Sequence, residues 1–167
     1  MTLSELMASY TPDSNYSGIV NTDDYVLAID PNPTAETPTA DSAYLVLEKG
    51  IEGQDASMNG ETSDKKYLRA GTSTIKTGQQ RTFSISGDRY VGDPAQDYLV
   101  GTKHKHGNDC ITNYLFFDIK TGKGEKGQVS IVVNNDGGGT AGSPATISVD
   151  LKQFGTLTNG SYTYSAV

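Results

Sequence analysis

The stretch of residues 81–101 constrains the fold of this 167-residue chain more than any other segment. Within it, Phe83 and Ile85 lie on one side of an extended chain, and hydroxyl side chains alternate with them on the other side. This period-two pattern is typical of a strand with one buried face. A turn is predicted at Gly87-Asp88, where the apolar alternation stops. The chain therefore requires a β-sheet whose apolar face packs against something else.

A short helix that starts and stops within residues 92–101 is predicted directly after this strand. Asp93 can cap its free N–H groups, and Pro94 suits its first position. Gly101 can take the left-handed conformation that ends a helix. The apolar stripe of this helix consists of Ala95, Tyr98 and Leu99. The pattern indicates one short helix placed among strands.

Other segments of the chain also have strand character. They are rich in β-branched or aromatic residues and bounded by turn residues, and one of them is apolar on both faces. The segments are 25–29, 43–47, 113–119, 128–133 and 145–154. Asn159-Gly160, flanked by Leu157 and Tyr162, is the favoured two-residue turn of a β-hairpin. With residues 82–86, these segments predict a mainly β fold, an antiparallel β-sandwich or small barrel flanked by one short α-helix.

The length predicts a single domain over residues 1–167, because domains cluster around roughly 100 to 150 residues. Residues 1–24 are interpreted as an N-terminal arm or a short helix. Leu3, Leu6 and Met7 have the spacing of one helical face, and a Thr-Pro-Asp sequence then interrupts the pattern.

The segment 48–80 has no clear periodicity and is rich in Gly, Asp, Ser, Lys and Glu. It is too long for a simple connection in a compact domain, and loops of that length are usually functional or disordered. Isolated apolar residues indicate that parts of it pack against another surface. We interpret this segment as a long extended loop.

The charge balance excludes several classes of protein. Thirteen basic residues against twenty acidic ones give a formal net charge of −7, whereas a nucleic-acid or anionic-membrane binder needs clustered Lys and Arg. No apolar run approaches the roughly 20 residues that span a bilayer. A single cysteine and an N-terminus without the zones of a signal peptide predict folding in a cytoplasm. Ten Tyr and four Phe supply the apolar surface for a modest core.

One weak candidate for a metal site is formed by His104, His106 and Cys110. Two imidazoles and a thiol could hold zinc, but a structural zinc site normally has four ligands with a defined second shell. The neighbouring lysines also disfavour a cation. The preferred interpretation is an exposed loop after the helix, with no metal and no cofactor.

The remaining candidates for chemistry have structural interpretations. The Gly-rich stretch 134–143 lacks the lysine of a phosphate loop and the acidic series of a calcium loop, so it predicts a mobile hairpin loop. Asp88, Asp93 and Asp97 could be paired carboxylates, but they fit better as a turn former, a helix cap and a solvated helix residue. No Ser, His and Asp order is present. We predict no catalytic residues and no enzymatic activity.

Several motifs follow one another in a characteristic order along residues 50–155. They are Gly50-Ile51-Glu52-Gly53-Gln54-Asp55, Met58-Asn59, Tyr67-Leu68, Phe83-Ser84-Ile85-Ser86-Gly87-Asp88-Arg89 and Gly92-Asp93-Pro94-Ala95-Gln96-Asp97-Tyr98. This order resembles that of the tail tube (major tail) proteins of long-tailed, non-contractile bacteriophages, the siphophages. The strand, the Gly-Asp-Pro helix start and the aromatic residue after it carry most of the resemblance.

The resemblance implies a structural virion protein. In that family six copies close into a ring, rings stack into the tail tube that conducts DNA into the host, and a long loop after the second strand reaches a neighbouring copy. The implied partners are other copies of the chain and the tape measure, tail terminator and tail tip proteins. The implied location is the tail of the virion, after synthesis in the host bacterial cytoplasm. The segment 48–80 matches the implied loop, so its deletion is expected to leave a soluble domain that cannot polymerise.

Six copies at −7 each carry −42 formal charges per ring. Carboxylates facing the lumen would repel the DNA backbone, so that DNA passes through without specific binding. Two alternative functions stay open. One is the inner tube of a contractile injection system, which shares the fold. The other is a carbohydrate-binding or adhesive β-sandwich module, although adhesins are usually exported and the chain shows no export signal.

Overall fold

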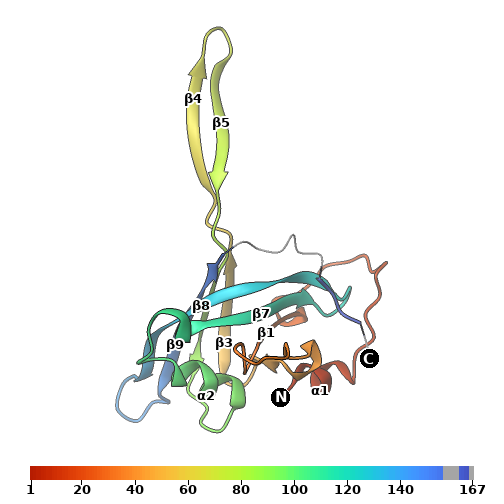
Figure 1. Cartoon of the computed structure of the whole chain (residues 1–167), viewed down its shortest axis with the longest axis vertical. Helices are drawn as coiled ribbons and strands as arrows, with labels where there is room; N and C mark the ends of the chain where they lie inside the picture. The colour runs from red at the N-terminus through yellow and green to blue at the C-terminus, as the bar shows by residue number, and fades with distance from the viewer. Residues whose placement is uncertain (156–161, 166–167) are drawn as a thin grey trace.

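A computed structural model of the chain describes residues 1–155 and 162–165. Eight strands form one antiparallel sheet, in which seven follow the order β2-β1-β7-β8-β9-β6-β3 and β10 pairs with β8 (Figure 1). Their bounds are β1 Tyr25–Ile29, β2 Leu45–Val46, β3 Ile51–Ser57, β6 Thr82–Asp88, β7 Ile111–Asp118, β8 Lys123–Gly138, β9 Thr146–Phe154 and β10 Tyr162–Thr163. The predicted mainly β, antiparallel fold is confirmed. The predicted turn at Asn159-Gly160 lies outside the described residues.

The sheet is curved but does not close into a barrel within the described residues. The long strand β8 pairs with β7 and β10 through its first part and with β9 through its second part. The edge strands β2 and β3 follow each other in the chain but are not hydrogen bonded to each other. The fold is therefore an open curved sheet with a seam between these two edges.

The segment 48–80, predicted as one extended loop, contains regular structure, and the loop interpretation was wrong for most of it. Its first part is β3, which pairs with β6 in the main sheet. The rest forms a separate two-stranded sheet of β4 (Glu61–Tyr67) and β5 (Gly71–Gly78). Figure 1 shows this hairpin projecting from one end of the molecule. Periodicity was hard to recognise because most side chains of the hairpin are polar and exposed.

Two α-helices flank the sheet, α1 (Leu3–Met7) and α2 (Pro94–Gly101). The second confirms the predicted helix, and the Asp93 side chain caps it by accepting a hydrogen bond from the Gln96 N–H at 3.1 Å. Gly101 does not end the helix in the left-handed conformation, because the C-cap is Thr102 with a right-handed backbone. The 3-10 helices are η1 (Thr22–Asp24), η2 (Asp41–Ala43) and η3 (Gly107–Cys110). Among the described residues, no helix has the length and apolar character needed to cross a membrane.

Hydrophobic clusters lie on both faces of the sheet. The larger one packs α2 against one face and contains Leu27, Phe83, Tyr114, Phe116, Val129, Val149 and Leu151. The smaller one packs α1 against the opposite face and contains Leu3, Met7, Val26, Ala28, Leu115 and Phe117. Strands β1 and β7 contribute to both clusters, as the two apolar faces of residues 113–119 predicted. The N-terminal residues are thus a packed helical turn.

Two predicted turns lie in strands. The turn predicted at Gly87-Asp88 was wrong, because β6 continues through both residues and pairs with β9 there. A Cβ at Gly87 would come within 2.0 Å of the Gly50 carbonyl oxygen, so glycine serves close backbone packing at this position. The predicted loop 134–143 was also too long, because β8 extends to Gly138 and pairs with β9 through two register shifts.

The packing of α1 can be tested with Leu3→Ala. Leu3 is fully buried in the smaller cluster. Removing its side chain leaves a cavity, so we expect the free energy of unfolding to fall by about 2–5 kcal/mol. Urea unfolding at one fixed protein concentration measures this change. Ser4→Ala, on the exposed side of the same helix, should change the free energy by less than about 0.5 kcal/mol. Equal stability of the two variants would contradict a packed N-terminus.

Candidate functional site

The structure does not bring the three candidate metal ligands together. His104 and His106 are exposed, whereas Cys110 is buried at the end of η3. His106 and Cys110 line one open cavity of about 430 Å³, and His104 is not part of its lining. Among residues 1–155 and 162–165, no group of three His, Cys, Asp or Glu side chains is arranged to hold a metal ion.

The three candidate carboxylates have separate structural roles. Asp88 lies at the end of β6, where its backbone carbonyl accepts a hydrogen bond from the Gln96 side chain at 3.1 Å. Asp93 is the buried N-cap of α2. Asp97 is an exposed residue of α2, as predicted, and it also forms an ion pair with Arg89, with 2.6 Å between Oδ1 and Nη2. Each of the three residues thus takes part in holding α2 at the end of β6.

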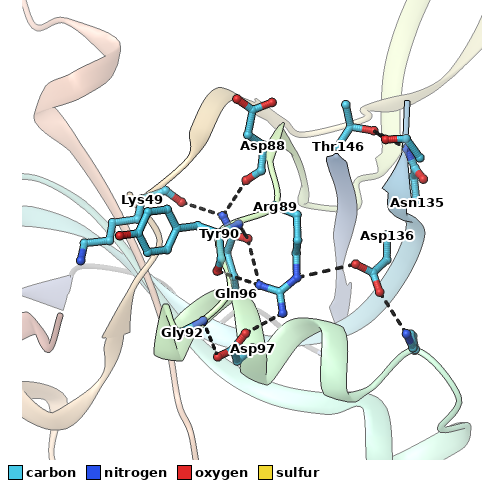
Figure 2. Close-up of polar contacts among 12 residues, drawn as sticks. Lys49, Asp88, Arg89, Tyr90, Gly92, Gln96, Asp97, Asn135, Asp136 and Thr146 are labelled. Carbon is cyan, nitrogen blue, oxygen red and sulfur yellow. Dashed lines mark hydrogen bonds and ion pairs between the residues drawn. The ribbon is translucent and has the colours of Figure 1, made fainter. Parts of the chain in front are cut away.

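A buried polar network around Gln96 joins α2 to the sheet (Figure 2). The Gln96 side chain is fully buried, and its Oε1 accepts hydrogen bonds from the Tyr90 N–H at 2.9 Å and from Arg89 Nη1 at 3.4 Å. Its Nε2 donates to the carbonyl oxygens of Lys49 at 2.6 Å and Asp88 at 3.1 Å. One amide thus ties the helix, the end of β6 and the connection before β3 together.

Arg89 extends this network to β8. Its guanidinium lies between Asp97 of α2 and Asp136 of β8, with 3.6 Å between Nε and Asp136 Oδ1. Lys103 reaches the other oxygen of Asp136 at 3.0 Å. Figure 2 shows Arg89 and Gln96 side by side between the helix and the strands. The network explains why the Gly-Asp-Pro motif is followed by Gln and Asp, a role that the sequence interpretation missed.

A local signal for Gln96 does exist in the sequence. A Gln three residues after an N-cap is half of a capping box, which predicts that its side chain returns to the backbone of the cap residue. In the structure the side chain bonds instead to Tyr90, Asp88 and Lys49. Because Lys49 lies 47 residues away in the sequence, local pattern alone could not identify this partner.

A second polar cluster lies beside the larger core. The Arg81 guanidinium stacks over the rings of Phe83 at 4.7 Å and Phe116 at 5.0 Å, and its Nε lies 2.7 Å from Glu125 Oε1. Tyr114 donates a hydrogen bond to the same carboxylate at 3.2 Å. Burial and the nearby Glu125 charge raise the pKa of Tyr114 above its ordinary value. Arg81 and Glu125 thus form an ion pair that lies against two aromatic rings. The cluster contains no activated nucleophile.

Two open cavities border the edge strand β3. One has a volume of about 720 Å³ and includes Arg81, Lys123 and Glu125 in its lining. The other has a volume of about 290 Å³ and is lined by residues from α1, η1, β1, β2 and β3. Thr22 and Gln54 line both cavities, so the two are adjacent. Open cavities therefore lie beside part of the edge strand β3.

The β4–β5 hairpin differs in charge from the rest of the chain. Residues 61–78 contain four basic and two acidic side chains, a net charge of +2. Since the whole chain carries −7, the remaining residues carry −9. At the turn of the hairpin, Leu68 is 85% exposed and Tyr67 is 49% exposed. A projecting basic element with apolar side chains at its end is a candidate contact surface.

Comparison with solved structures identifies proteins that share the fold of this chain. No protein-family model and no curated protein matches the sequence. Among solved structures, the chain is similar to a protein in the tail of an empty gene transfer agent particle refined with C6 symmetry, at 15% identity and a TM-score of 0.58. That match covers 84% of this chain and 98% of the other. A protein in the virion of a native gene transfer agent particle matches at 14% identity and a TM-score of 0.59, with 83% and 97% covered.

These matches show which fold the chain has. The chain has the fold of a protein found in the tail of a gene transfer agent particle. The resemblance to tail tube proteins that the sequence motifs indicated is therefore confirmed at the level of the fold.

The role of Gln96 can be tested with Gln96→Met, which conserves length but removes all four hydrogen bonds. The variant leaves the Tyr90 N–H and two carbonyl oxygens without their partner, and each buried unsatisfied group costs about 1–3 kcal/mol. We expect the free energy of unfolding to fall by at least about 2 kcal/mol in urea titrations. The control is Gln80→Met on the surface, with an expected change below about 0.5 kcal/mol. A Gln96→Met protein as stable as this control would show that the network is not stabilising.

Proposed function

We propose that this protein is a non-enzymatic subunit of a tail tube, and that six copies form a ring and rings stack into the tube. The observation that carries the proposal is the shared fold with a tail protein whose particle was refined with C6 symmetry. Further support comes from the motif order between residues 50 and 155. In this proposal the whole chain is one tail-tube unit and resides in the tail of the virion.

The projecting hairpin supports a role in assembly. An isolated two-stranded hairpin is marginally stable in water, because two strands bury little surface. Here β4 and β5 pair only with each other, and nearly all of their side chains are exposed. A neighbouring copy that covered the hairpin would supply the missing burial. The contact is proposed to form between adjacent copies of the chain.

The partners of the tube follow from the same proposal. Other copies of the chain are the main partner, and the ends of the tube meet the tape measure, tail terminator and tail tip proteins. The protein is made in the cytoplasm of a host bacterium. DNA passes through the lumen without specific binding, because a ring of six copies carries −42 formal charges.

Assembly can be tested by deleting the hairpin alone. Residues 61–78 can be removed without disturbing the main sheet, because the Gln80 N–H already donates to the Met58 carbonyl oxygen at 3.0 Å. The shortened turn keeps Asn59-Gly60, a favoured hairpin turn. Deletion of all of 48–80 would instead remove the edge strand β3. We expect the full chain to form rings or tubes in negative-stain electron microscopy and the deletion variant to remain dispersed.

Circular dichroism of the deletion variant supplies the control, since a folded β-rich spectrum shows that the main sheet is intact. Two results would contradict the proposal. One is a full chain that stays monomeric and binds glycans, which would favour the adhesive alternative. The other is a folded deletion variant that forms the same tubes as the full chain.

The role of the negative charge can be tested in assembled tails. Replacing carboxylates that face the lumen by Lys should slow DNA ejection, because positive charges attract the phosphate backbone and raise friction. The rate of ejection from otherwise normal particles is the measurement, and raising the salt concentration should reduce the difference. An unchanged ejection rate at low salt would contradict the repulsive lumen.

A further inference from the structure

The tip of the hairpin combines exposed apolar side chains with positive charge. We define the hairpin tip as residues 65–69, with the sequence Lys-Lys-Tyr-Leu-Arg. Leu68 projects with 85% of its surface exposed, and basic side chains flank it on both sides. Arg69 has a φ of 64°, a conformation in which Gly or Asn would be less strained.

A cavity with complementary properties lies on the seam of the same protein. We define the acidic groove as the cavity of about 290 Å³ that Asp23, Asp24, Glu48 and Glu52 help to line. Its fifteen lining residues include these four carboxylates and no Lys or Arg. Asp24 has one cationic neighbour, Lys120, at 3.8 Å, and the other three carboxylates have no ion pair among the described residues.

The lining of the acidic groove also contains apolar residues. They come from four elements and are Leu6, Val26, Val46 and Ile51. The volume is large enough for a projecting apolar side chain, since an engineered cavity of about 150 Å³ holds benzene. A groove lined by apolar and acidic residues is complementary to a tip with an apolar residue and basic neighbours.

The geometry favours a contact between copies over a contact within one copy. The hairpin leaves the main sheet after the last residue of β3, Ser57, and points away from the domain (Figure 1). The acidic groove lies beside the first four residues of β3, from Ile51 to Gln54. The tip and the groove are thus at opposite ends of one strand. Strands of seven and eight residues extend the hairpin by roughly 25 Å, enough to reach beyond its own domain.

We propose that the hairpin tip of one copy docks into the acidic groove of the next copy, with Leu68 against the apolar lining residues and Lys66 and Arg69 against Glu48 and Glu52. The inference rests on the proposed tube assembly and specifies where the hairpin binds. The tip and the groove are different surfaces at opposite ends of β3, so the contact is head-to-tail. Head-to-tail contacts form a closed ring if the rotation between copies closes, and otherwise an open stack. It therefore gives a stack of copies a direction.

The neighbouring cavity of about 720 Å³ is a weaker acceptor for the same tip. Its lining includes Arg81 and Lys123 as well as Asp118 and Glu125. Glu125 is already paired with Arg81 at 2.7 Å. A basic tip placed there would meet like charges, which disfavour binding. Charge therefore selects the acidic groove over the larger cavity.

Cysteine cross-linking tests the contact directly. A chain with Leu68→Cys and Glu52→Cys should form a ladder of disulfide-linked multimers when assembled protein is oxidised, and reductant should remove the ladder. Each single substitution should give no product beyond a dimer, and Cys110 is buried in all of them. The matched control pairs Leu68→Cys with Asn108→Cys, at an exposed position on η3 away from the seam.

The outcomes of cross-linking separate the two proposals. Tubes with a ladder only in the Leu68→Cys, Glu52→Cys chain support the docking site. Tubes without that ladder, or with an equal ladder in the Asn108→Cys control, overturn the docking site and leave tube assembly intact. A full chain that forms no tubes under any condition overturns tube assembly, and the docking inference with it.

Charge exchange gives an independent test. Lys66→Glu with Arg69→Glu in the tip should reduce tube formation at least tenfold, and Glu48→Lys with Glu52→Lys in the groove should do the same. All four changes in one chain should restore most of the tubes, because the charges are complementary again. Glu36→Lys with Asp109→Lys adds the same charge at exposed sites outside the groove and should leave assembly unchanged. Failure of the fourfold variant to recover, or equal loss in this control, would overturn the docking site.

Discussion

The antiparallel pairing of β1 with β7 is the contact on which the rest of the structure depends. In its register Leu27 lies opposite Phe116, and Ala28 lies opposite Leu115. Because successive side chains of a strand point to opposite faces, one pair of strands supplies apolar residues to both hydrophobic clusters. The larger cluster holds α2 and the smaller one holds α1. A register shift of one residue would exchange the two faces and disturb both clusters together.

The open seam is the second constraint, because the edges of a sheet present unpaired backbone groups. The N-terminus protects one edge: the Val46 N–H donates to the Met1 carbonyl oxygen at 3.0 Å, and Thr2 bridges Leu45. The other edge, β3, borders both cavities and leads directly into the hairpin. Its outer side has no partner strand among the described residues, and contacts between chains are proposed there.

Charge is distributed unevenly in the same region. The hairpin carries +2 on a chain whose other residues carry −9, and its tip exposes Leu68. Uniformly acidic surfaces repel one another, so copies of an acidic protein need a local attraction to assemble in one orientation. In the proposed docking, a basic tip and an acidic groove at opposite ends of β3 supply this attraction. The apolar side chains at both places would then become buried, which they are not in a single copy.

Local periodicity and capping signals in the sequence were enough to predict the mainly β class, the short helix that begins after the Asp93 cap, and the two apolar faces of residues 113–119. It did not show the strands within 48–80, whose exposed polar side chains carry no burial pattern. It also missed the roles of Gln96 and Asp97, since their partners Lys49 and Arg89 are placed by the fold. Two features came only from the tertiary structure. The strands β2 and β3 do not pair with each other, and the hairpin tip and the acidic groove lie at opposite ends of β3. Those features depend on sheet curvature and strand order, which arise from contacts between residues far apart in the chain.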